Sequence, residues 1–421
     1  MLLKTIRIAT IAALALVPDI SVAQFTPPPA PPALTITVLG WSDYIAPQVM
    51  EDYSRQTGVR VIYDVFESEA AFEGRLAEAK GFYDLVTPPA RLLPKLIAAG
   101  QLQKLDRAVV PGARDLWPEI AAKLAALDPG NQYALAHMWF GYGLAYDRKK
   151  AAERLPEAQM ASWDVLFKPE TLKKFTNCGV RLPDDADLVL QVSLLALKQP
   201  GELRTPADVR RAADAAGRLR PNITEFLSGG AAALADGEIC LALMPASEAA
   251  QARDQARTSE PPRDIGFVVP REGAPLSLDA LAMLKDAPHP VESARFAAFL
   301  QHPEVAARNS AGTRFAGGVL AARELLGDEM RADRFFWPED EVLRRLIALP
   351  APDPALRKLI EREWLKVKTG SYEVAPLEPA GKKGKAGKKD DKALARPGQK
   401  AAPEPVAPVK KPRRPGEKPT G

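Results

Sequence analysis

The sequence predicts an α/β protein with two lobes, and three observations support this prediction. Strand-like and helix-like segments alternate from residue 34 to residue 99, which is typical of βαβ units and a largely parallel sheet. An apolar, aromatic stretch over 132–147 then interrupts the alternation, and a second α/β region follows over 149–257. Residues 24–370, about 350 in number, exceed the ~250–300 residues that one hydrophobic core usually organises. We therefore expect two lobes.

The first 23 residues are typical of a secretory signal. Lys4 and Arg7 supply positive charge, residues 8–17 form a short apolar run, and the small residues 21–23 fit cleavage after Ala23. Because a membrane span needs about 20 apolar residues, we expect a cleaved leader and export to the periplasm. The alternative is an uncleaved N-terminal anchor. Residues 24–33 form a proline-rich spacer that should be extended.

The elements of the first α/β region follow from hydrophobic periodicity. Residues 34–39 alternate β-branched and apolar side chains, which predicts a strand that Gly40 should end. The same patterns predict, in order, a helix over 47–57 capped by Gly58, a strand over 59–66, a helix over 69–79, a strand over 84–87 and a helix over 91–99.

The aromatic stretch over 132–147 suits an extended crossover between the two lobes. Beyond the second α/β region, the patterns predict strands over 265–270 and 278–284, helices over 289–300 and 303–308, and a final amphipathic helix over 354–368 with Leu356, Leu359, Ile360 and Trp364 on one face.

Charge is distributed unevenly along the chain. It has 57 Lys and Arg against 53 Asp and Glu, a formal net charge of +4. Residues 371–421 hold 13 of the basic and 6 of the acidic side chains, so the rest of the chain has a net charge of −3. A mildly acidic body does not favour nucleic-acid binding, for which a basic face is expected.

Residues 371–421 are rich in Lys, Pro and Ala and almost free of aromatic and branched side chains. Such a composition cannot bury enough apolar surface to offset chain entropy, so this tail should be disordered. One interpretation is an electrostatic tether that touches an anionic envelope surface, lipid or cell-wall polymer. The alternative is a solvated tail without a specific role.

The chain has two cysteines, Cys178 and Cys240. In an exported protein an even pair indicates one disulfide. Its loop of about 62 residues would stabilise the fold by ~4 kcal/mol in the chain-entropy description. The alternative is two separate buried thiols.

Catalytic and metal-binding motifs are absent from the sequence. It has no G-x-S-x-G, Walker A, H-E-x-x-H or dinucleotide fingerprint. The three histidines, His137, His289 and His302, lack metal-ligand spacing. We therefore expect neither an enzyme nor a bound cofactor or metal. His137 lies in the aromatic crossover. We expect it to be a packed or hinge histidine, and the alternative is a contact with a ligand.

A polar and aromatic cluster, Trp41, Ser42, Asp43 and Tyr44, directly follows the first predicted strand. In an open α/β sheet, ligands bind outside the carboxyl ends of the strands. An organic ammonium group needs oxygen acceptors for its N–H groups and an aromatic face for its charge, and this cluster offers both. The alternative for Trp41 is a place in the core.

With these residues in view, the chain resembles the periplasmic putrescine- and spermidine-binding proteins of polyamine ABC importers, above all the putrescine-specific branch. The likeness extends over about residues 39–370. Its most specific blocks are residues 41–47, 61–66, 162–170, 177–180, 219–223, 236–240 and 364–368.

The resemblance implies the type II periplasmic-binding-protein fold, with mixed sheets, flanking helices and a ligand cleft between two lobes. One lobe would hold 34–138 and 264–311, and the other 141–259 and 317–370. The lobes would close on the ligand by a hinge motion, and the protein, expected to be a monomer, would dock on an inner-membrane permease. The family's cysteine pair falls on Cys178 and Cys240.

The family's polyamine contacts carry over in part. Trp41, Ser42, Asp43 and Tyr44 match its motif, and Asp279 matches a carboxylate that binds one ammonium end. Glu248 replaces an Asp, Phe315 replaces a Tyr, and Asp185 keeps an acidic residue that the spermidine branch uses.

Four expected contacts are lost: Pro89 replaces a Ser, Leu188 a Glu, Pro245 a Trp and Ser277 an aromatic residue. Each lost charge-assisted hydrogen bond would cost about 1.5–3 kcal/mol of binding free energy. Asp187 is an alternative carboxylate if the alignment slips at Leu188. The sequence thus predicts a binding protein for a polyamine or a related organic cation. The alternatives are a different small solute in the same fold, or a sensor or scaffold outside transport.

Overall fold

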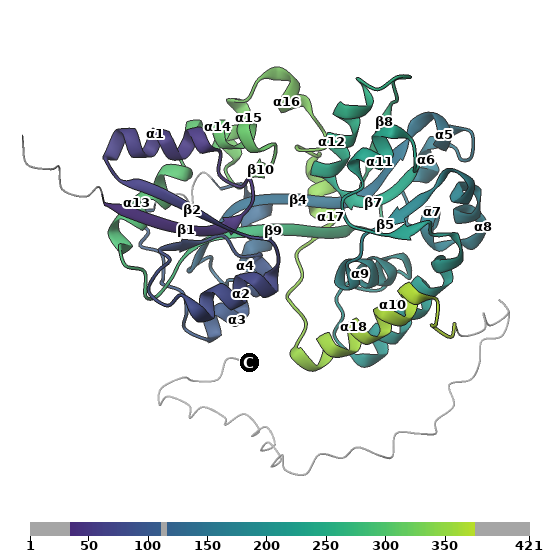
Figure 1. Cartoon of the computed structure of the whole chain (residues 1–421), viewed down its shortest axis with the longest axis horizontal. Helices are drawn as coiled ribbons and strands as arrows, with labels where there is room; N and C mark the ends of the chain where they lie inside the picture. The colour runs from purple at the N-terminus through teal and green to yellow at the C-terminus, as the bar shows by residue number, and fades with distance from the viewer. Residues whose placement is uncertain (1–33, 111–115, 375–421) are drawn as a thin grey trace, which may run out of the picture. The chain divides into compact units, whose positions relative to one another are not determined.

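A computed structural model describes residues 34–110 and 116–374, which fall within one compact unit (Figure 1). The predicted signal, the spacer and the tail from residue 375 lie outside the described residues. In the part that is described, no helix has the length and apolar character needed to cross a bilayer.

The strands form one connected, mixed sheet. Pairing is parallel at both ends, between β1 and its neighbours and between β5 and its neighbours, and antiparallel in the middle. The spatial order is β2 (Arg60–Phe66), β1 (Thr35–Trp41), β3 (Leu85–Val86), β9 (Ala274–Met283), β4 (Ala134–Asp147), β7 (Leu241–Pro245), β5 (Val180–Leu182) and β6 (Glu225–Phe226). Three strands pair to the side of this order: β8 (Ile265–Val268), β10 (Ala316–Gly317) and β11 (Leu346–Ile347).

Two long strands, β4 and β9, connect the ends of the sheet (Figure 1). The first part of β4 pairs with β9, and its last part pairs with β7 and β8. The extended segment predicted over 132–147 is therefore confirmed. The parallel pairing predicted for the first α/β region is confirmed between β1 and its neighbours β2 and β3. The sheet as a whole is mixed, as expected from the family, because β4 and β9 pair directly and antiparallel without a βαβ crossover.

Helices surround both ends of the sheet. Figure 1 shows α1 (Pro47–Thr57), α2 (Glu69–Glu78), α3 (Leu93–Ala98), α4 (Pro118–Ala125) and α13 (Pro290–Leu300) around the β1 end. At the β7 end it shows α5 (Arg148–Ala152), α7 (Asp164–Phe167), α8 (Pro169–Leu172), α9 (Ala186–Ala196), α10 (Pro206–Leu219) and α18 (Pro354–Thr369). The remaining α-helices are α6 (Glu157–Met160), α11 (Ala231–Asp236), α12 (Ala246–Ala256), α14 (Pro303–Thr313), α15 (Leu320–Glu324), α16 (Asp328–Ala332) and α17 (Asp340–Arg345), and the 3-10 turns are η1 (Ala90–Leu92), η2 (Lys173–Cys178) and η3 (Arg220–Asn222).

The largest group of buried side chains is continuous across the molecule. It extends from Leu39 and Phe66 at the β1 end, through Trp139 of β4, to Leu243 of β7. The crossover strands therefore carry the apolar packing from one end of the molecule to the other.

Helix α1 shows how closely local signals set the element bounds. It begins at Pro47, which needs no hydrogen-bonded N–H there, and ends at Thr57 as predicted. Gly58 adopts φ 74° and donates its N–H to the carbonyl of Ser54, which closes the helix.

The predicted strand end at Gly40 is wrong, since β1 continues to Trp41. Gly40 is instead a point of close approach: a Cβ there would lie 2.1 Å from the hydroxyl of Tyr63. That hydroxyl donates to the carbonyl of Trp41 at 2.6 Å. Glycine therefore leaves room for the side chain that fixes the end of β1.

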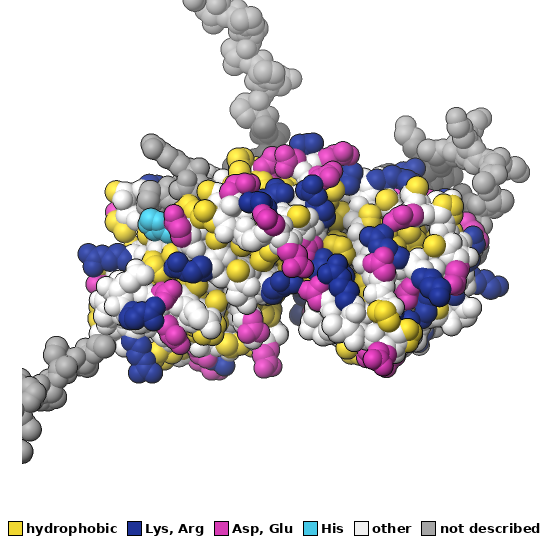
Figure 2. Space-filling view, turned by 90° about the horizontal axis from the view of Figure 1, so that it is seen from above, with side chains coloured by type: hydrophobic (Ala, Val, Ile, Leu, Met, Phe, Trp, Pro, Cys, Tyr) yellow, Lys and Arg dark blue, Asp and Glu magenta, His cyan; other side chains and the backbone are white. Residues whose placement is uncertain are grey.

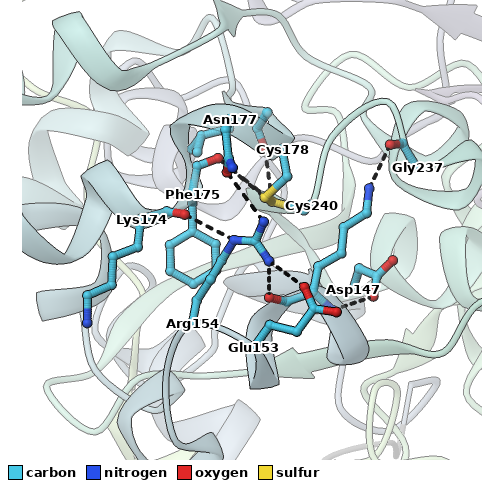
Figure 3. Close-up of a disulfide and its surroundings, with 12 residues drawn as sticks. Asp147, Glu153, Arg154, Lys174, Phe175, Asn177, Cys178, Gly237 and Cys240 are labelled. Atoms are coloured by element: carbon cyan, nitrogen blue, oxygen red, sulfur yellow. Dashed lines mark hydrogen bonds and ion pairs between the residues drawn. A yellow bond between two sulfur atoms is a disulfide. The ribbon is translucent and has the colours of Figure 1, made fainter.

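The predicted disulfide between Cys178 and Cys240 is present, with their Cα atoms 5.5 Å apart. Figure 3 shows that the guanidinium of Arg154 lies against the loop that carries Cys178. Its Nε donates to the carbonyl of Lys174 at 3.0 Å. On the other side, Lys150 donates to the carbonyl of Gly237 at 2.9 Å. Lys150 of α5 and Arg154, two residues beyond its end, thus hold the segments that lead to the two cysteines.

Basic and acidic side chains are interspersed on the face seen from above in Figure 2.

Candidate ligand-binding site

The turn after β1 is held by an asparagine from α14. The amide of Asn309 donates to the carbonyl of Tyr44 at 3.0 Å, and its oxygen accepts the N–H of Ala46 at 2.8 Å. Asp43, in the same turn, adopts φ 61°, and its carboxylate accepts a hydrogen bond from Ser42 at 2.9 Å. The turn directs Tyr44 inward, where it is buried, while Ser42 and Asp43 are exposed.

Asp279 of β9 lies at the centre of the cluster and is 1% exposed. The indole Nε1 of Trp41 donates to Oδ1 at 3.0 Å, and the hydroxyl of Tyr44 donates to Oδ2 at 2.9 Å. Among residues 34–110 and 116–374, no Lys or Arg forms an ion pair with this carboxylate. Burial raises the pKa of Asp279 to about 7, although the hydrogen bonds from Tyr44 and Trp41 oppose the rise. Within the described part of the chain, Asp279 is thus a buried acid without a cationic partner.

Asp279 opens onto a cavity of about 360 Å³, here called the Asp279 cavity. Four of the predicted site residues line it: Trp41, Tyr44, Asp185 and Asp279. Three of the four departures from the family pattern line it as well: Pro89, Leu188 and Ser277.

Two neighbouring cavities take up most of the other predicted residues. A cavity of about 650 Å³ is lined by Asp43, Glu248 and Phe315. A smaller one of about 150 Å³ is lined by Asp185 and Leu188, which it shares with the Asp279 cavity, and by Pro245 and Glu248. Ser42 lines none of these three cavities.

Aromatic rings form a continuous wall between the cavities. The ring of Phe315 lies 5.0 Å from that of Tyr44 and 5.9 Å from that of Phe140, which lies 5.6 Å from Tyr142. Phe140 and Tyr142 are site residues that we did not predict. They occupy alternate positions of β4, so both side chains leave the strand on one face. That alternation within the aromatic stretch was the available signal.

Tyr142 lies among three carboxylates. Burial raises its pKa, and the charges of Asp185, Asp279 and Glu248 raise it further. Burial also raises the pKa of Asp185 and of Glu248. Each of these acids accepts one backbone N–H, Asp185 as the N-cap of α9. The wall between the cavities is therefore acidic and aromatic at once, which suits an organic cation.

Asp187, the alternative carboxylate at the Leu188 position, also lines the Asp279 cavity. Its Oδ2 accepts from Arg91 and from Arg357, each at 2.5 Å. It is thus already paired with two cations, whereas Leu188 presents an apolar surface.

His137 is buried behind Tyr44, with their rings 6.4 Å apart, and lines none of the three cavities. Burial lowers its pKa to about 4. In the region that the structure covers, no three His, Cys, Asp or Glu side chains are arranged to hold a metal ion.

Comparison with known proteins places the chain in a family. Residues 48–333 match the bacterial extracellular solute-binding proteins. The chain is 35% identical over 339 residues to the putrescine-binding periplasmic protein PotF of Escherichia coli, covering 80% of this chain and 92% of that one. It is 32% identical over 335 residues to the putrescine-binding periplasmic protein SpuD of Pseudomonas aeruginosa, covering 79% and 91%.

Solved structures agree on the fold. The spermidine/putrescine substrate-binding protein PotD of Streptococcus pneumoniae superposes with a TM-score of 0.69 at 23% identity, over 80% of this chain and all of that one. The fold is therefore the two-lobed type II periplasmic-binding-protein fold, and the chain belongs to the bacterial extracellular solute-binding protein family.

Proposed function

We propose that this protein is the extracytoplasmic solute-binding subunit of an ABC importer, and that its solute is a putrescine-like polyamine or a related organic cation. The names of its relatives support the solute class. The single observation that carries the proposal is Asp279, a buried carboxylate with two neutral donors and no cationic partner among the described residues.

A ligand ammonium group supplies what Asp279 lacks. Burying an unpaired carboxylate is costly, and a cation in direct contact offsets that cost. The ammonium group would donate to Asp279, and the rings of Trp41 and Tyr44 would line the methylene groups of the ligand. Asp185 and Glu248, which line the smaller cavity together with Tyr142, would receive a second ammonium group, with Phe315 as part of the aromatic wall. Asp43 would contact the ligand from the neighbouring cavity of about 650 Å³, and Ser42 would support it through its hydrogen bond to the Asp43 carboxylate.

In transport, the protein would act as a monomer in the periplasm after cleavage of its signal. The lobes, 34–138 with 264–311 and 141–259 with 317–370, would close on the ligand and present it to the permease. The basic tail would touch an anionic envelope surface.

The test is an amine panel with the purified protein after bound ligand has been removed. Thermal unfolding is recorded with putrescine, cadaverine, agmatine and spermidine. A ligand that binds only the folded state stabilises it by about 2.7 kcal/mol at 100 times its dissociation constant. A saturable shift with an amine supports the proposal, and no shift with any amine, from a folded protein, contradicts it.

A different small solute is the second candidate function. Pro89, Leu188, Pro245 and Ser277 all line the cavities and remove polar or aromatic groups at contact positions. A shift with a non-amine solute, and none with the amine panel, would favour this candidate.

A further inference from the structure

An arginine lies in the wall of the Asp279 cavity. Arg91, in η1, lines it together with four carboxylates, those of Glu69, Asp185, Asp187 and Asp279. A fixed guanidinium is unexpected where the proposed ligand is itself a cation, because like charges repel strongly in a partly buried site.

Two of these acids hold Arg91 in place. Its Nε donates to Oε1 of Glu69 at 2.5 Å, and its Nη1 donates to Oδ2 of Asp187 at 2.5 Å. Arg357 of α18 donates to the same oxygen of Asp187. Glu69 and Asp187 are therefore already compensated by cations of the protein, and a ligand would have to displace Arg91 to use them.

The other two acids remain open to a ligand. Asp279 accepts from Trp41 and Tyr44, and Asp185 accepts the backbone N–H of Leu188. Neither forms an ion pair with another described residue. Burial raises the pKa of both acids, and the positive charge of Arg91 opposes each rise, so its field reaches both positions. The wall thus offers two uncompensated acids and one fixed cation.

We infer that Arg91 limits the charge and length of the ligand: the site admits a short amine with one or two ammonium groups and excludes a triamine. A third ammonium group would extend to the part of the cavity where Arg91 already occupies Glu69 and Asp187. Leu188, beside Asp187, adds no acceptor there. This inference rests on the proposed function and specifies its ligand class.

The experiment compares the affinities for putrescine and spermidine by calorimetry in the full mature protein. Arg91→Met keeps a long side chain without its charge, and Arg91→Lys keeps the charge. Arg357→Met is the matched control, because Arg357 contacts the same oxygen of Asp187 and its charge also acts on Asp185, but it does not line the cavity. We expect the wild type to prefer putrescine. Arg91→Met should raise the spermidine-to-putrescine affinity ratio about tenfold or more, whereas Arg91→Lys and Arg357→Met should leave it unchanged.

Several results would overturn the inference. A wild type that binds spermidine as tightly as putrescine already contradicts it, without any variant. If Arg91→Met still binds putrescine and its spermidine-to-putrescine affinity ratio is unchanged, Arg91 connects η1 to α2 and α9 but does not select the ligand. If Arg357→Met changes the affinity ratio as much as Arg91→Met does, the place of Arg91 in the cavity wall does not explain the selectivity. If Arg91→Met does not fold, Arg91→Gln takes its place. If neither the wild type nor any variant binds either amine, the proposed function fails as well.

Discussion

At the scale of single residues, the protonation of Asp279 should control ligand binding. Burial raises its pKa to about 7, so in the free protein the carboxyl is neutral below that pH and ionised above it. Only the ionised form attracts an ammonium group, so affinity should fall about tenfold per pH unit below 7. We predict that the dissociation constant rises on the order of 100-fold between pH 8 and pH 5, measured by calorimetry.

The raised pKa of Asp279 also determines how the free energy of unfolding of the ligand-free protein changes with pH. Because the folded-state pKa lies above the ordinary value of 3.8, the stability that Asp279 contributes is full below that value and is lost as pH rises through about 7. Affinity and ligand-free stability should therefore change in opposite directions over this range. A flat affinity profile between pH 5 and pH 8 would contradict the assignment of Asp279 as the cation acceptor.

The residues of the site were predictable to different extents. Trp41 and Tyr44 follow a strand directly, so their place at a sheet edge follows from local sequence. Asp279 came from the resemblance, since nothing nearby in the chain marks it. Arg91 could not be predicted, because its partners Glu69 and Asp187 lie on α2 and α9, and only tertiary packing brings the three together.

At the scale of secondary structure, Gly40 couples the first strand to the site. An added Cβ would lie 2.1 Å from the Tyr63 hydroxyl, which holds the carbonyl of Trp41. We predict that Gly40→Ala lowers the free energy of unfolding by about 1–3 kcal/mol and weakens ligand binding. Urea unfolding and calorimetry measure the two effects.

Gly74→Ala is the matched control. Gly74 lies within α2, and an added Cβ would meet no atom within 4 Å. Alanine should leave stability unchanged or raise it slightly, since glycine is the poorer helix former. Equal effects of the two substitutions would show that the contact with Tyr63 is unimportant.

Element bounds were predictable where one residue decides them. The bounds of α1 follow from Pro47 and Gly58, which act through their own backbone. The role of Gly40 depends on Tyr63 of a neighbouring strand, so local sequence predicted a break where the strand continues. Helix α14 extends beyond residue 308 to Thr313, and this added part carries Asn309, which is buried and holds the turn at Tyr44.

At the scale of the whole molecule, the disulfide should contribute substantially to stability. Cys178 and Cys240 close a loop with a sequence separation of 62. We predict that Cys178→Ser with Cys240→Ser lowers the free energy of unfolding by about 4 kcal/mol, measured by urea unfolding. Reduction of the wild type should lower stability to a similar degree. If the reduced wild type unfolds at the same urea concentration as the oxidised one, the bond has no such role.

The two-lobed fold was predictable, but the continuity of its core was not. Chain length and the interruption over 132–147 indicate two α/β regions. They do not show that β4 pairs with β9 along its first part and with β7 along its last part. This pairing connects the apolar side chains of the two ends into one buried cluster.

The most direct test of the central claim is the affinity of Asp279→Asn for putrescine, or for whichever amine binds the wild type, measured by calorimetry at pH 8. Asparagine keeps the size of the side chain and removes its charge. Loss of a charge-assisted hydrogen bond should weaken binding about 10- to 100-fold, while the variant stays folded. Wild-type affinity in a folded Asp279→Asn protein would contradict the claim that this buried carboxylate binds the cation.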